Sequence, residues 1–245
     1  MKKLLVAALC VMAGFSGVVS AADNAEELIK QNLHKVDPRI KVKSISPAPL
    51  AGMSEVELNS GEVIYADSKG EYFLIGQLYR YTTQAGFVNL SEEKAKEQRK
   101  AKLDAVSEKE MVVFAPEGEV KATVNIFTDV DCPYCRKLHD EVPKLNEMGI
   151  QVNYLAFPRN GQGTKTYNTM VSIWCAKGAE AKREAMTEAK QGMNLDKADC
   201  NSPVMSQLAL GQAVGVTGTP AMVFEDGSLV PGYVPAARLS KMLGL

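Results

Sequence analysis

Two cysteines separated by two residues follow directly on an apolar strand pattern, and this arrangement constrains the chain more than any other feature. Residues 124–127 form the apolar end of a predicted strand, a turn with two aspartates follows, and Cys132-Pro-Tyr-Cys135 comes next. A helical pattern then places Leu138 and Leu145 on one side of a predicted helix over residues 132–148. The order strand, turn, Cys-x-x-Cys and helix predicts a redox site at the start of that helix.

The chemistry expected of this site follows from the position of each cysteine. Cys132 is the first residue of the predicted helix, where unpaired backbone N–H groups and the helix dipole favour an anion. A lowered thiol pKa supplies thiolate, which is the species that attacks disulfides. Cys135 lies one turn later and can close onto Cys132, which we expect to be the more exposed thiol. Pro133 fits the helix start, because its missing N–H leaves no bond unmade there.

Two other interpretations of the cysteine pair remain open from the residues alone. The pair could form a plain structural disulfide, or it could supply half of a zinc site. A zinc site needs two further ligands at suitable spacing, and long helical stretches separate Cys175 and Cys200 from the pair. The context therefore favours redox chemistry, with no metal and no bound cofactor.

The charges that flank the pair act in opposite directions. Arg136 and Lys137 favour a thiolate on Cys132, whereas the adjacent Asp131 disfavours one. His139 lies two turns along the helix, and we interpret it as a surface or packing residue rather than a base.

The first residues indicate export. Two lysines precede an apolar stretch that ends in Val19-Ser-Ala21, a small-x-small cleavage site, which predicts a signal peptide at residues 1–21. No later stretch is long enough for a membrane span, so no membrane insertion is expected. The net charge of −1 suggests no nucleic-acid partner. An exported chain with four remaining cysteines is expected to form two disulfides, naturally Cys132–Cys135 and Cys175–Cys200.

The pattern of residues 22–86 predicts an α+β first domain, in which we identify no candidate catalytic residues. A helical pattern over residues 24–36 precedes alternating strand patterns over residues 40–45, 53–58, 62–65 and 72–75. Residues 76–83 read as an edge strand that either pairs with another copy or simply ends the sheet. Residues 87–108 predict a polar linker helix, capped by Ser91, although a disordered tether is an alternative.

Residues 109–245 predict an α/β domain in the thioredoxin order, with a helical insertion at residues 165–210. Strand patterns occur at residues 111–114, 120–127, 150–157, 221–224 and 229–230, and the last helix covers residues 235–243. Cys175 and Cys200 lie in the insertion and are interpreted as a structural disulfide, with a second redox pair as the rival.

Several further motifs extend the pattern across nearly the whole mature chain, and together they resemble the DsbC-type periplasmic disulfide isomerases of the DsbC/DsbG family. These motifs are Phe127-Thr-Asp, Cys132-x-Tyr-Cys135, Lys137-Leu-His139, Tyr154-Leu-Ala-Phe-Pro-Arg159, Ile173-Trp-Cys-Ala-Lys177, Gly215-Val-x-Gly-Thr-Pro220 and Leu229-Val-Pro-Gly-Tyr233.

The resemblance implies a cystatin-like dimerisation domain, a linker helix and a thioredoxin-like catalytic domain. It implies a periplasmic homodimer that binds misfolded disulfide-containing exported proteins as a chaperone does. Cys132 attacks a wrong disulfide, and a membrane thiol reductase of the DsbD type keeps the site reduced. A cis Pro220 is implied beside the cysteines, with Thr219, Pro220, Pro133 and Tyr134 contacting the substrate.

One residue departs from the family pattern. The residue after the first cysteine is usually glycine, and here it is Pro133, as in glutaredoxins and DsbG-type proteins. Residues between the cysteines tune the redox potential of the pair. A DsbG-like reductase of sulfenylated cysteines is therefore an alternative to the isomerase, and a holdase chaperone with only structural disulfides is another.

Overall fold

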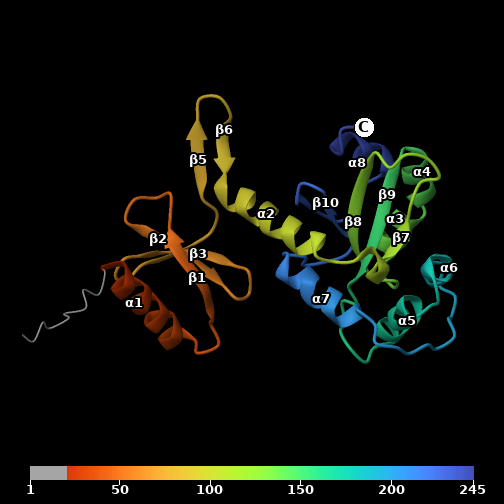
Figure 1. Ribbon diagram of the computed structural model, residues 1–245, viewed down its shortest axis with the longest axis horizontal. Helices are drawn as coiled ribbons and strands as arrows, with labels where there is room; N and C mark the ends of the chain where they lie inside the picture. The colour runs from red at the N-terminus through yellow and green to blue at the C-terminus, as the bar shows by residue number, and fades with distance from the viewer. Residues whose placement is uncertain (1–20) are drawn as a thin grey trace, which may run out of the picture. The chain divides into compact units, whose positions relative to one another are not determined.

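A computed structural model describes residues 21–245, which divide after Gly76 into two compact units (Figure 1). The signal peptide predicted at residues 1–21 lies outside the described residues, except for Ala21, where the first helix begins. Each unit is described by itself.

The first unit is a helix packed on an antiparallel sheet, as the sequence predicts. Its strands pair in the order β1-β2-β3-β4, and Ile29 and Leu33 of the helix join Val56 and Ile64 in one buried cluster. The turn before β4 needs glycine at Gly70, where φ is +62° and a Cβ would lie 3.0 Å from the Ile29 Cα. The elements are α1 (Ala21–Val36), β1 (Val42–Pro47), β2 (Met53–Leu58), β3 (Val63–Asp67) and β4 (Phe73–Ile75).

The second unit begins with a hairpin of β5 (Tyr79–Thr82) and β6 (Gly86–Asn89). Strand β5 is shorter than the strand predicted at residues 76–83, and one of its two edges pairs with β6. Strand β6 was not predicted, because only two of its four residues, Phe87 and Val88, are strand formers.

The linker prediction corresponds to helix α2 (Leu90–Asp104), which has a different cap from the predicted one. The Asn89 side chain accepts a hydrogen bond from the Glu92 N–H over 3.1 Å. The Ser91 hydroxyl instead accepts one from the Leu78 N–H, so the prediction of a Ser91 cap is wrong. The Arg99 side chain is buried on this helix, and its Nε donates to the carbonyl of Gly227 over 2.6 Å.

The remainder of the second unit follows the predicted thioredoxin-like order around a sheet of order β11-β10-β8-β9-β7. Strands β8 and β9 are parallel and are joined by a helical crossover, whereas the other neighbours are antiparallel. The remaining elements are η1 (Glu108–Glu110), β7 (Val112–Phe114), β8 (Ala122–Thr128), α3 (Pro133–His139), α4 (Val142–Glu147), β9 (Ile150–Ala156), α5 (Lys165–Trp174), α6 (Ala179–Lys190), α7 (Val204–Ala213), β10 (Ala221–Phe224), β11 (Leu229–Pro231) and α8 (Ala236–Met242).

The two faces of this sheet carry separate cores, because successive strand residues point to opposite faces. Ile126 and Tyr154 belong to the larger cluster, which includes residues from α3, α4, α5, α6 and α8. Phe127 and Leu155 belong to the smaller cluster, with Leu208 of α7 on the opposite face. The sheet therefore holds the end of β8, where the cysteines follow, between two packed layers.

The crossover is two short helices rather than the single predicted helix over residues 132–148. Helix α3 ends at His139 and α4 begins at Val142. Pro143 causes the break, because it has no N–H to donate to the carbonyl four residues earlier, at His139.

Candidate functional site

Cys132 lies at the N-terminus of α3, after the turn that leaves β8. Asp129 organises the turn: its Oδ1 accepts from the Asp131 N–H over 2.8 Å, and its carbonyl accepts from the Cys132 N–H over 3.3 Å. Pro133 opens the helix, and Cys132 is the residue that precedes the first turn. The thiol is therefore held at the positive end of the helix, as the sequence predicts.

The Cys132 thiol contacts the loop that precedes β10. It donates a hydrogen bond to the Thr219 carbonyl over 3.2 Å, and the peptide bond between Thr219 and Pro220 is cis. The Thr219 Oγ1 is buried and has no hydrogen-bond partner in the described part of the chain. Pro133 and Tyr134 lie beside Cys132 and are exposed to solvent. The structure thus brings together the site residues that the resemblance implies.

The two thiols are equally buried but have opposite pKa shifts. Cys132 is 2% exposed and Cys135 is 1% exposed, so exposure does not separate them as we expected. Burial raises the pKa of Cys132, but contacts with Thr219 and the Cys135 N–H and the charge of Arg159 outweigh it, and the pKa is lowered overall. At Cys135 burial prevails, and the pKa of that thiol is raised. Cys132 is therefore the thiol that ionises more readily.

Arg159 supplies a positive charge that helps to lower the pKa of the reactive thiol. It follows β9, and its Nε donates to Asp129 Oδ2 over 3.0 Å while its backbone N–H donates to the same oxygen over 3.1 Å. The Asp129 side chain is almost completely buried, so its carboxylate fixes the guanidinium in place. This pair was not predicted to belong to the site, although both residues lie in motifs on which the family resemblance rests.

The charges that the sequence left in balance are mostly engaged with other groups. The Asp131 carboxylate accepts hydrogen bonds from Thr166 Oγ1 over 2.5 Å and from Arg136 over 3.2 Å. Lys137 Nζ lies 4.5 Å from the centre of the Tyr233 ring. Asp131 therefore opposes the thiolate less than its place in the sequence suggests, because its charge is paired.

His139 packs inside the domain and is not placed to serve as a base. It is 7% exposed, its Nδ1 lies 3.2 Å from the Tyr154 hydroxyl, and its Nε2 lies 3.1 Å from Thr187 Oγ1. Burial lowers the pKa of His139 to about 4, so the ring is neutral at pH 7. Of the two alternatives to a base, a surface residue or a packing residue, the structure supports the packing residue.

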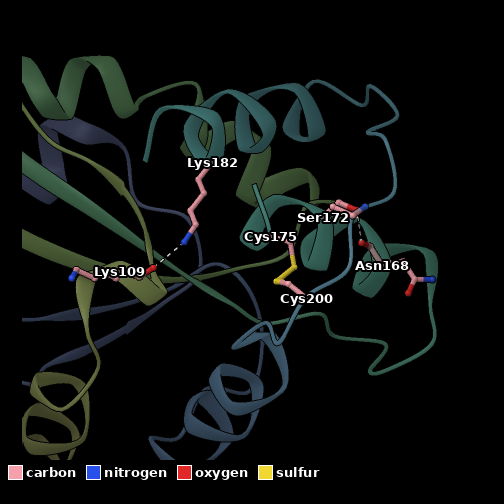
Figure 2. The surroundings of a disulfide bond; sticks show 7 residues. Lys109, Asn168, Ser172, Cys175, Lys182 and Cys200 are labelled. Carbon is pink, nitrogen blue, oxygen red and sulfur yellow. Dashed lines mark hydrogen bonds between the residues drawn. A yellow bond between two sulfur atoms is a disulfide. The ribbon is translucent and has the colours of Figure 1, made fainter. Parts of the chain in front are cut away.

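Cys175 and Cys200 form a disulfide between the end of α5 and the segment before α7 (Figure 2). Their sulfurs are 1.99 Å apart and their Cα atoms 5.8 Å apart, across a sequence separation of 25. Trp174 anchors the same end of α5, because its Nε1 donates to the Glu110 carbonyl over 2.7 Å. Neither cysteine starts a helix, unlike Cys132, so the geometry lacks the feature that lowers the Cys132 pKa.

Within the described residues, no cluster of three or more histidine, cysteine, aspartate or glutamate side chains is arranged to hold a metal ion. Over the same residues, no helix has the length and apolar character that a membrane span requires.

Two family models match the chain. The model of the thioredoxin-like domain matches residues 107–245, and the model of the disulfide bond isomerase protein N-terminal domain matches residues 19–92. The two matches leave only residues 93–106 between them, which are most of α2 and the two residues after it.

Curated relatives and solved structures give the same result. The thiol:disulfide interchange protein DsbC of Escherichia coli K12 is 39% identical over 233 residues, which are 95% of this chain and 92% of that protein. The DsbC of Dickeya dadantii is 34% identical over 243 residues, which are 99% of this chain and 95% of that protein. A disulfide interchange protein from Neisseria gonorrhoeae superposes with a TM-score of 0.50 at 25% identity, over 57% of this chain and 96% of that chain.

Proposed function

The chain belongs to the DsbC family of thiol:disulfide interchange proteins, and we propose that it rearranges incorrect disulfides in exported proteins with Cys132 as the nucleophile. The opposite pKa shifts of the two buried thiols carry this proposal. The shifts give Cys132 the thiolate that attacks and leave Cys135 protonated until it is needed.

The first step is an attack of the Cys132 thiolate on one sulfur of a substrate disulfide. A bond forms between Cys132 Sγ and that sulfur, and the other substrate sulfur leaves as a thiolate. The carbonyl of Thr219 lies beside Cys132, so an extended substrate segment can approach along the loop that contains Pro220. Exposed Tyr134 offers an aromatic surface at the same place.

The mixed disulfide then has two outcomes. If another substrate thiolate attacks it, the substrate gains a new disulfide and Cys132 leaves as a thiolate, with no net electron transfer. If Cys135 attacks instead, Cys132 and Cys135 form a disulfide, and the substrate leaves reduced by two electrons. The second outcome requires an external thiol reductant, for which we propose a membrane reductase of the DsbD type.

We further propose that the protein acts as a periplasmic homodimer that holds misfolded clients. The match to the isomerase N-terminal domain supports dimerisation through the first unit. On that unit, Tyr72 and Ile75 at the β4 edge are 74% and 73% exposed. Exposed apolar side chains of this size are unfavourable in water and are typical of a surface that binds another protein. The basic and apolar start of the sequence supports export.

A second candidate function rests on Pro133. Proline after the first cysteine is shared with DsbG-type proteins, which suggests reduction of sulfenylated cysteines on exported proteins. In that reaction the Cys132 thiolate attacks the sulfenic sulfur and displaces hydroxide, and Cys135 then releases the reduced substrate.

The test is recovery of a scrambled multi-disulfide protein in a fixed glutathione buffer. Wild type is compared with Cys132→Ala and Cys135→Ala. We expect wild type to restore native pairing and Cys132→Ala to lose this activity, because no other thiol among residues 21–245 combines a lowered pKa with this position. Activity that remains in Cys135→Ala would show that rearrangement does not need the resolving thiol.

Other outcomes decide against the isomerase. If Cys132→Ala works as well as wild type, the nucleophile is wrongly assigned and the protein acts as a holdase. If wild type fails to restore pairing but reduces a sulfenylated substrate, the second candidate replaces the first.

A further inference from the structure

Lys190 is a buried lysine that the exchange reaction described above does not use. It is the last residue of α6 and is 4% exposed. Its Nζ donates to the Thr128 hydroxyl over 2.6 Å and to the Asp129 carbonyl over 3.0 Å. Both acceptors are neutral, and a buried ammonium is costly when its hydrogen-bond partners carry no opposite charge. Such a costly group suggests a use beyond packing.

The Thr128 hydroxyl links this lysine to the resolving thiol. Thr128 is fully buried at the end of β8, and its side chain favours the Cys135 thiolate, which opposes the rise in the pKa of that thiol. The Thr128 hydroxyl therefore interacts with both the Lys190 amine and the Cys135 thiol, and none of these residues is more than 4% exposed. Water has little access to the Cys135 thiol, so its proton needs an internal acceptor.

We propose that Lys190 accepts the proton of Cys135, through the Thr128 hydroxyl, when Cys135 resolves a mixed disulfide. This inference rests on the proposed function of Cys132 and Cys135 and assigns a proton path to its second step.

The step balances in atoms and electrons. The Cys135 thiol gives its proton to Thr128 Oγ1 while the Thr128 hydroxyl proton passes to the neutral amine of Lys190. The Cys135 thiolate attacks Cys132 Sγ, the disulfide between Cys132 and the substrate breaks, and the substrate leaves as a thiolate. Cys132 and Cys135 lose two electrons, which the substrate sulfurs gain. Lys190 releases its proton to solvent, and the substrate thiolate takes one from solvent.

The groups around Lys190 give it a pKa suited to this exchange. Burial lowers the pKa of Lys190 to about 8, although Cys135, Asp129 and Cys132 favour the ammonium and Arg136 opposes it. A general base works best when its pKa is near the working pH.

Two further titratable side chains face the amine. The Tyr154 ring centre lies 5.7 Å from Nζ, and burial raises the Tyr154 pKa well above its usual value. His139 is neutral at pH 7, because burial lowers its pKa to about 4. Neither group changes its charge near pH 8, so neither accounts for a titration of the second phase there, and the first phase reports the titration of Cys132 separately.

A purely structural role makes a different prediction. Lys190 could only anchor the turn after β8 through its two hydrogen bonds. In that case, substitutions would affect stability and both steps of exchange together. A proton path instead separates the second step from the first and changes its pH dependence.

The experiment uses the reduced full-length protein and the aromatic disulfide dithiobis(nitrobenzoate), with release of the coloured thiolate followed by stopped flow. Attack by Cys132 releases the first thiolate, and resolution by Cys135 releases the second. The Cys135→Ala variant gives the first phase alone and so identifies it. Absence of a first phase in wild type, or its persistence in Cys132→Ala, would refute the proposed function rather than the proton path.

The variants separate the amine, the hydroxyl and the fold. Lys190→Met removes the amine, and Thr128→Val removes the hydroxyl but keeps the lysine charge. Thr128→Ser restores a hydroxyl. Lys182→Met is the matched control, because Lys182 is also on α6 but donates to the Lys109 carbonyl near the structural disulfide (Figure 2).

We expect the second phase to slow about tenfold or more in Lys190→Met and Thr128→Val, while the first phase changes less than about threefold. Thr128→Ser should recover most of the lost rate, and Lys182→Met should match wild type. In wild type the second phase should rise through about pH 8, and in Lys190→Met this rise should move to higher pH. The Thr128 pair decides the question if Lys190→Met does not fold. An unchanged ratio of the two phases, with an unchanged pH profile, would overturn the proposal.

Discussion

Removal of the disulfide between Cys175 and Cys200 should lower the stability of the second unit without removing its fold. The bond closes a loop across a sequence separation of 25, which contains all of α6. In the chain-entropy model, a loop of about 25 residues gives about 3.5 kcal/mol at room temperature. The native helices keep their own contacts, because Met186 and Ala189 of α6 are part of the main core.

Urea unfolding measures this loss through the fluorescence of Trp174, the one tryptophan of the chain. Trp174 is 3% exposed and precedes Cys175, so its emission reports the unfolding of this unit. The comparison uses Cys175→Ala/Cys200→Ala in a Cys132→Ser/Cys135→Ser background, so that the active-site thiols contribute nothing. With a slope of about 2 kcal/mol per molar urea, the midpoint should fall by about 1.7 M.

The controls test the cause of the loss. The parent protein with its disulfide reduced should have the same urea midpoint as the double variant. The single variant Cys175→Ala should have this midpoint too. A loss below about 1 kcal/mol would refute the loop-closure reasoning, because the bond would then restrict the unfolded chain too little to matter.

Two further predictions concern charge. Arg159→Met should raise the pKa of Cys132, which is measured from the pH dependence of thiol alkylation. Lys165→Met, at an exposed position, is the control and should leave that pKa unchanged. Equal Cys132 pKa values in Arg159→Met and wild type would contradict the role assigned to Arg159. His139 has a folded pKa of about 4. Because the unfolded imidazole titrates near 6.5, the unfolded state binds more protons between these values, and stability should fall as the pH drops through this window. The loss between pH 7 and pH 5 should be about 2 kcal/mol by urea unfolding. His139→Gln should lack this part of the pH dependence, and a loss of the same size in that variant would assign it to other groups.

The fold was predictable where periodic patterns are long. Alternating apolar residues located β2 and β8 closely, and the Cys-x-x-Cys after β8 identified the thioredoxin-like order. Short elements and their ends were not predictable, since β6 has only four residues and competing polar side chains surround the start of α2. The break at Pro143 carried a local signal, because an internal proline ends a helix, but the apolar period runs through it.

The site was predictable where function depends on neighbouring residues. The Cys-x-x-Cys spacing identifies Cys132 and Cys135, and the family resemblance implied Pro220. Lys190 gave no local signal, because its partner Thr128 lies 62 positions earlier and only the packing of α6 brings them together. Arg159 lies in a family motif, but the sequence does not show that its charge acts on Cys132, because the two residues are far apart along the chain.

Asp129 contacts two cations, and each of them acts on one of the two buried thiols. Its carboxylate holds Arg159, which favours a thiolate at Cys132, while its carbonyl accepts from Lys190, whose charge acts most on Cys135. Burial alone would raise the pKa of both thiols. The order of attack follows from what opposes burial at each thiol. At Cys132 the contacts with Thr219 and the Cys135 N–H, together with the charge of Arg159, outweigh burial, whereas at Cys135 burial prevails over the charge of Lys190.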